Sequence, residues 1–146
     1  FISQKIFSMI IKTLFIALTH WIAYIVLGII FSQNIPVEGL SAICLNLFLM
    51  AITFGAISVF IGTLSGNSTQ AISIGGALAM AGYLIANIAP LVDSLNNTKY
   101  FALFYYYKGS DPLKFGFHSW HWIPFVVITF IFIFLSIYQF KKRNLL

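Results

Sequence analysis

The sequence contains very little charge. Of its 146 residues only 8% are charged, and just three are acidic: Glu38, Asp93 and Asp111. Soluble domains carry about 25% charged residues, so this composition excludes a water-facing fold. The length leaves room for one membrane domain and for no sizeable soluble domain. We therefore predict an all-α polytopic membrane protein, because a helix pairs its own backbone groups where lipid offers no partner.

Several kinds of chemistry also lack their usual residues. The single cysteine, Cys44, lies in an apolar run, so it makes no disulfide within the chain and is expected to pack as a small apolar residue. The sequence has no Gly-rich phosphate loop, no paired carboxylates, and no Ser–His–Asp set near a polar cleft. No acidic residue lies in an apolar run, which argues against a carrier driven by protons or sodium. We expect no catalytic residue, cofactor or metal in this chain.

Two long uncharged runs dominate the middle of the chain. Leu40–Leu64 has 25 residues and Ala71–Val92 has 22, and neither contains a charge. At about 1.5 Å per residue each run is long enough to cross a hydrocarbon core of about 30 Å. Only six polar residues separate them, which is too few to cross the bilayer again. The runs therefore predict a transmembrane hairpin.

Two further spans complete the predicted domain. They cover residues 13–31 and 120–140, so the transmembrane domain is 13–146 and contains four spans. Residues 1–12 mix Lys5 and Lys12 with apolar residues, which is typical of a helix at the membrane surface. Residues 93–119 are half polar and rich in Tyr and Phe, so we expect short interfacial helices there, broken at Gly109–Pro112.

The basic residues indicate the orientation. Five lie on the side of the two chain ends: Lys5, Lys12, Lys141, Lys142 and Arg143. Three lie on the other side, at positions 99, 108 and 114. Because cytoplasmic loops carry the excess of Lys and Arg, we predict both ends to be cytoplasmic and the protein to reside in the cell membrane. This distribution accounts for the net charge of +5 without a nucleic-acid partner.

Small residues recur at fourfold spacing in the central hairpin. The set that we single out is Ser58, Gly62, Gly66, Gly75 and Ala79. In lipid, helices associate through close van der Waals contact, and small residues let their backbones approach. This pattern indicates packing within the chain, or a subunit interface or pathway lining, and the pattern alone does not separate these alternatives.

A few polar or aromatic residues inside the spans are candidates for lining a pathway. They are His20, Asn46, Thr53 and Phe54. An ionisable residue at membrane depth suggests function, and the alternative for His20 is a structural hydrogen bond. His118 and His121 have a spacing that metal ligands can use, but Asp111 is the one carboxylate nearby, so we favour an aromatic helix start over a metal site.

Four segments, in this order, resemble the C-terminal two-thirds of an ABC transporter permease of the type-2 exporter family. Residues 2–12 resemble the segment after that family's cytoplasmic coupling helix. Residues 55–70 resemble the tight turn between its fourth and fifth helices, although the basic residue often found there is absent. Residues 93–119 resemble its aromatic extracellular segment, and 138–145 its closing aromatic, basic and Asn-Leu pattern. The family's first two helices have no counterpart in this sequence.

The resemblance implies a permease subunit of an ATP-driven exporter. Its partners would be ABC ATPase subunits that hold ATP and Mg²⁺, a second permease subunit, identical or different, and the bilayer. The cargo would be amphipathic or lipid-like: a drug, an antimicrobial peptide or a lipid. Lys5 and Lys12 would lie at the coupling end, and residues 105–111 would cap the outer end of the pathway. Two alternatives remain open: a structural or immunity-type membrane subunit that transports nothing, and a small intramembrane enzyme using His118, His121 and Asp111.

Overall fold

The computed structural model describes residues 2–108 and 120–144. Four helices in this part of the chain are long and apolar enough to cross a membrane. They are built on α1 (Ile2–Ile30), α2 (Val37–Ser65), α3 (Ser68–Ile88) and α6 (Ile123–Asn144). Two 3₁₀ turns extend them, since η1 (Ala89–Leu91) continues α3 and η3 (Trp120–Trp122) leads into α6. The described residues form helices and no strands, which confirms the all-α polytopic membrane fold.

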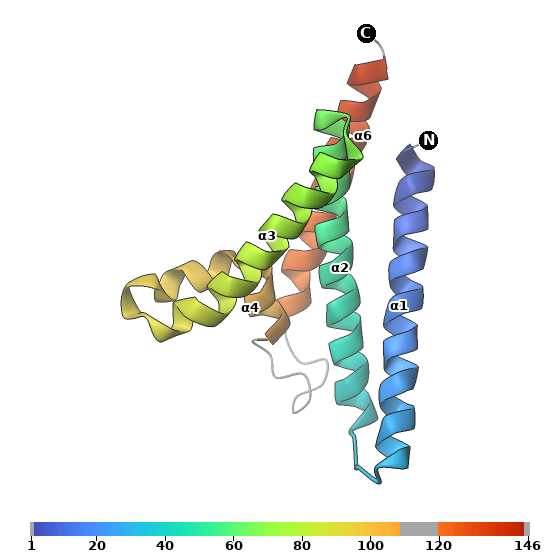
Figure 1. Ribbon diagram of the computed structural model, residues 1–146, viewed down its shortest axis with the longest axis vertical. Coiled ribbons are helices and arrows are strands. Elements are labelled where there is room, and N and C mark those ends of the chain that lie inside the picture. Colours follow the sequence, from blue (N-terminus) through green and yellow to red (C-terminus); the bar gives the residue numbers. More distant parts are fainter. Residues whose placement is uncertain (1, 109–119, 145–146) are drawn as a thin grey trace.

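Helix α2 lies at the centre of the bundle. Helices α1, α3 and α6 all pack along it, while α1 and α3 share no extended contact. Helix α1 runs antiparallel beside α2, whereas α3 leans away from α2 as it leaves their shared turn (Figure 1). Both chain ends lie at the end of the bundle that holds the α2–α3 turn (Figure 1). The two ends are therefore on one side, as four spans require.

Helix α1 begins earlier than its predicted span. It has 29 residues and a length of about 43 Å, and it continues through Lys12 and Thr13 without a break. The Thr13 hydroxyl donates to the Met9 carbonyl at 2.8 Å, a bond that keeps this polar side chain satisfied inside the helix. Residues 2–30 are thus one helix, which crosses the predicted boundary between a surface segment and a span at residues 12 and 13.

The turn between α2 and α3 is as short as the sequence predicts. Gly66 ends α2 in the left-handed region with φ 68°, and its N–H donates to the Gly62 carbonyl at 2.9 Å. Asn67 then caps α3, because its side chain accepts from the Thr69 N–H at 2.9 Å. Glycine ends a helix in this conformation without steric cost, so the chain reverses at once.

Small residues let the helices approach one another. A Cβ placed on Gly75 of α3 would collide with Ser58 of α2, and one on Gly62 would touch Ala71 at 3.4 Å. Nearer the middle of α2, Gly55 lies directly against Met9 of α1. These contacts all lie within the one chain, and they bring α1 and α3 close to the backbone of α2.

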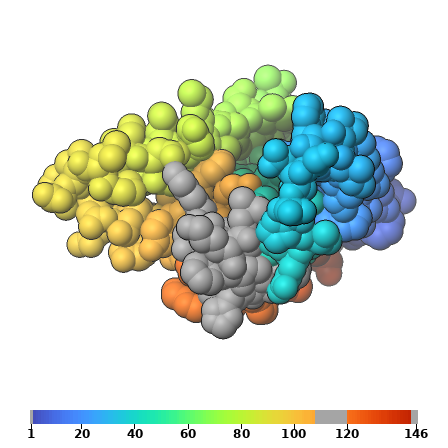
Figure 2. Space-filling model, turned by 90° about the horizontal axis from the view of Figure 1, so that it is seen from below, coloured from blue at the N-terminus to red at the C-terminus, as the bar shows by residue number. Residues whose placement is uncertain are grey.

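The stretch between α3 and α6 forms short helices. They are η2 (Asp93–Phe101) and α4 (Leu103–Lys108), and they separate at Ala102. The predicted break at Gly109–Pro112 lies outside the described residues. From the end opposite the termini, η2 projects to one side of the bundle and α1 lies on the other (Figure 2). We predicted short interfacial helices in this stretch, and the structure adds that α4 packs against α2 and α3.

Candidate functional site

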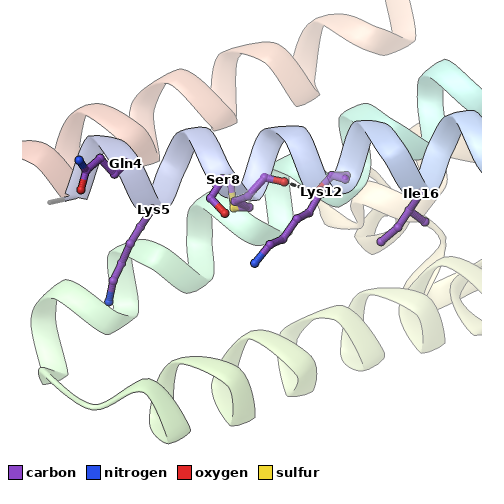
Figure 3. Close-up of a pocket in the computed structure, with 7 residues that line it drawn as sticks. Gln4, Lys5, Ser8, Lys12 and Ile16 are labelled. Atoms are coloured by element: carbon purple, nitrogen blue, oxygen red, sulfur yellow. Dashed lines mark hydrogen bonds between the residues drawn. The ribbon is translucent and has the colours of Figure 1, made fainter.

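Basic side chains gather at the end of the bundle that holds both termini. Lys5 and Lys12 are exposed on α1, and Lys141, Lys142 and Arg143 are exposed in the last turn of α6. The two lysines of α1 are seven residues apart, which places them on one face about two turns from each other. Both side chains leave α1 on the same side (Figure 3). The structure therefore brings the two predicted coupling residues together.

A shallow groove follows this face of α1. Its volume is about 490 Å³, and Lys5, Ser8, Lys12 and Ile16 are among the residues that line it. The Lys12 side chain runs back toward the N-terminal end of α1 (Figure 3), the usual direction for a long side chain on a helix. A lysine near a span end reaches toward water in this way while its stem covers apolar surface.

A second cavity lies beside the groove and shares Lys5 with it. Its volume is about 500 Å³, and α1, α2, α3 and α6 all contribute to its wall. The wall includes three of the predicted small residues, Ser58, Gly62 and Gly66. Small side chains at these positions allow the helices to approach closely, and they also leave the volume of the cavity unfilled.

Arg143 joins α6 to the end of α2 at this cavity. Its Nη1 donates to the Thr63 carbonyl at 3.3 Å, and its guanidinium lies directly against Gly66. A cation is favourable there, because the last carbonyls of a helix carry partial negative charge. From the sequence, Arg143 was predicted only as part of the basic C-terminal end. Its partner lies 80 residues earlier, so no local pattern indicated this role.

Two of the four pathway candidates, His20 and Asn46, line neither the groove nor the cavity at this end. His20 is exposed on α1, and its Nδ1 lies 2.9 Å from the Ile16 carbonyl oxygen. Since a carbonyl only accepts, Nδ1 carries the proton in this bond. Asn46 is half-buried on α2.

Thr53 is completely buried between α2 and α6. Its Oγ1 lies 2.8 Å from the Leu49 carbonyl, 3.2 Å from the Phe125 carbonyl and 2.9 Å from Thr129 Oγ1. The single hydroxyl proton of Thr53 serves one of these acceptors at a time, and either threonine can be the donor in the bond between Thr53 and Thr129. Within this chain Thr53 belongs to a polar contact between helices and faces no open space.

Phe54 points to a different neighbour. Its ring lies 5.8 Å from that of Phe104 on α4, and Phe104 also meets Tyr83 of α3 at 5.6 Å. Phe54 is eleven residues before the end of α2, about 17 Å along the axis. The first turn of α4 therefore docks near the middle of α2.

The remaining aromatic residues hold α4 and η2 together. The rings of Tyr100 and Tyr105 lie 5.2 Å apart, and the Lys99 ammonium lies 5.2 Å from the Tyr100 ring. The pKa of Tyr107 is raised above its usual range, mainly by burial and then by the neighbouring Tyr24 hydroxyl of α1. Helix α4 thus reaches from α3 across α2 toward α1.

The structure describes one member of the suggested enzyme site. His118 and Asp111 lie outside the described residues. The His121 ring lies 5.3 Å from Trp120 and 6.2 Å from Tyr106, within the aromatic surroundings of η3. Ala79, the last of the small residues predicted for packing, is half-exposed on α3.

Comparison with known proteins gives no relative to set beside this arrangement. No protein-family model matches the chain, and neither the curated proteins nor the solved structures contain a match.

Proposed function

We propose that this chain is the membrane-spanning permease part of an ATP-driven exporter of the ABC type-2 kind. It moves an amphipathic or lipid-like compound, and a separate ATPase chain binds ATP and Mg²⁺. The observation that carries the proposal is the exposed lysine pair on α1. Lys5 and Lys12 share one face at the end of the bundle where both termini and the basic residues of α6 lie. That end is cytoplasmic in this proposal, following the excess of basic residues.

The exposed apolar surface of α3 is available to a second permease subunit. Helix α3 presents Ile72, Met80 and Tyr83, which are 73%, 66% and 53% exposed. Lipid covers such a surface as well as protein does, so exposure alone selects neither. In the proposal a second permease, identical or different, packs beside this chain, and the cargo passes between them.

Co-purification tests the proposal directly. The full-length protein is extracted from its own membranes in mild detergent, and its partners are identified by mass spectrometry. We expect a stoichiometric ATPase, and ATP hydrolysis should fall when Lys5 and Lys12 are both changed to Gln. The matched control is Lys142→Gln, which removes a charge at the same end of the bundle from α6.

The outcomes separate this proposal from the alternatives. If no ATPase accompanies a stable protein, the chain is a structural or immunity-type subunit that transports nothing. If an ATPase binds but Lys142→Gln lowers hydrolysis as much as the α1 double variant, the lysine pair has no special role in coupling.

A further inference from the structure

The cavity between α1, α2, α3 and α6 combines a basic rim with an apolar wall. Lys5 and Arg143 lie on its rim, and no acidic residue is among the described residues that line it. The apolar part of the wall consists of Ile2, Val59, Ala71, Ile72 and Phe140. A site of this composition suits a molecule with an anionic group at one end and hydrocarbon at the other.

We propose that this cavity binds an anionic phospholipid, with the phosphate held by Lys5 and Arg143. The proposal concerns a bound lipid and does not depend on transport. The two cations come from opposite ends of the chain, and each reaches the cavity from a different helix. An arginine carries five N–H donors, so the single bond from Arg143 to the Thr63 carbonyl leaves donors for a phosphate oxygen.

The position of the cavity fits the place of a lipid headgroup. It lies at the end of α2 and the beginning of α3, beside Gly66 and Ser68. Basic pockets between transmembrane helices on the cytoplasmic side bind anionic headgroups, because that leaflet is negatively charged. The first turn of α3 adds partial positive charge at the same level.

The acyl chains have a path out of the cavity. Helices α1 and α3 share no extended contact, so packing between these two helices does not close this side of the cavity. The groove along α1 continues from Lys5 past Met9 to Ile16, at the middle of α1. The volume of about 500 Å³ is within the usual range of ligand sites.

Native mass spectrometry tests this binding on the purified protein. The protein in neutral detergent is titrated with dioleoyl phosphatidylglycerol and, separately, with dioleoyl phosphatidylcholine. We expect phosphatidylglycerol to bind more tightly, and Lys5→Gln and Arg143→Gln each to weaken it about fivefold. Lys5→Gln is the primary variant, because Lys5 is exposed, whereas Arg143 also bonds to the end of α2. Arg143→Lys should retain binding within about twofold, since it keeps the charge.

The matched control is Lys142→Gln, which removes a neighbouring charge that does not line the cavity. It should change binding less than about twofold. An equal loss in Lys142→Gln and Lys5→Gln would mean that lipid adheres to the basic end without a site, and would overturn the proposal. So would equal binding of phosphatidylcholine. Displacement of the lipid by millimolar inorganic phosphate would show a site for free anions, which also contradicts a lipid site.

Discussion

The hydroxyl oxygens of Thr53 and Thr129 lie 2.9 Å apart across the contact between α2 and α6. Thr53 has no exposed surface, and its oxygen also lies 3.2 Å from the Phe125 carbonyl. The two helices are 76 residues apart in the chain at this contact. In lipid, where apolar surface does not drive helices together, such a polar contact helps to fix which faces meet.

Thr53→Val should therefore destabilise the bundle. Valine has nearly the same shape as threonine but cannot bond to Thr129, so we expect a loss of about 1 kcal/mol. Thermal unfolding in detergent measures it. Thr129→Val should cost a similar amount, and the double variant should cost less than the sum of the two. Loss of transport with unchanged stability would instead favour the pathway role first suggested for Thr53.

Gly75→Ala should separate α2 from α3. The new methyl group would collide with Ser58, and overpacking of this kind costs about 1–3 kcal/mol. Gly76→Ala is the matched control, because a Cβ there meets nothing within 4 Å. Adding Ser58→Gly should restore much of the stability of Gly75→Ala. If Gly75→Ala and Gly76→Ala unfold at the same temperature, the close contact does not hold the two helices.

Gly66→Ala should weaken the turn between α2 and α3. An alanine at φ 68° is strained by about 1 kcal/mol, and its methyl group would displace the Arg143 guanidinium. Gly66→Asn should cost less, since asparagine tolerates the left-handed region better. The thermal midpoint in detergent should fall in the order glycine, asparagine, alanine, and equal midpoints for the last two would contradict the strain.

Phe104→Ala should release α4 from the bundle, because its ring meets both Phe54 and Tyr83. We expect faster hydrogen exchange in Leu103–Lys108, measured by mass spectrometry. Phe101→Ala provides the control, since Phe101 is 91% exposed. Equal exchange in the two variants would show that other contacts hold α4.

High pH should loosen the same helix. The raised pKa of Tyr107 means that the folded protein holds the phenolic proton more tightly than the unfolded chain does. Stability should therefore fall as the pH rises past about 10, the usual pKa of tyrosine. Tyr107→Phe should lose less stability than wild type between neutral and alkaline pH. An equal loss of stability in wild type and Tyr107→Phe over this pH range would contradict the prediction.

The spans were predictable because the length of an uncharged run reports directly on membrane crossing. The hairpin predicted over 40–64 and 71–92 matches α2 and α3 with its η1 extension, and Gly66 marks the turn as expected. The sequence could not show that α1 starts at Ile2, since isolated lysines at a span end fit both a surface helix and a continuous one.

The neighbours of individual residues were less predictable. Aromatic residues of α4 suit the membrane surface as well as a bundle interior, so their density did not reveal that Phe104 packs near the middle of α2. Arg143 fitted the positive-inside pattern, which concealed its contact with the end of α2. Long-range partners of this kind depend on how the helices pack, and apolar helices leave many arrangements open.

The central place of α2 has a mechanical consequence. The lysine-bearing face belongs to α1 and the docked α4 rests on α2 and α3, yet α1 and α3 share no extended contact. A movement imposed on α1 would therefore reach α3 mainly by turning or sliding α2. Along α2, Thr53 contacts Thr129 of α6, Gly55 contacts Met9 of α1 and Ser58 contacts Gly75 of α3, all within six residues. The three outer helices thus all contact one short length of α2, so a rotation of α2 at this point would displace all three.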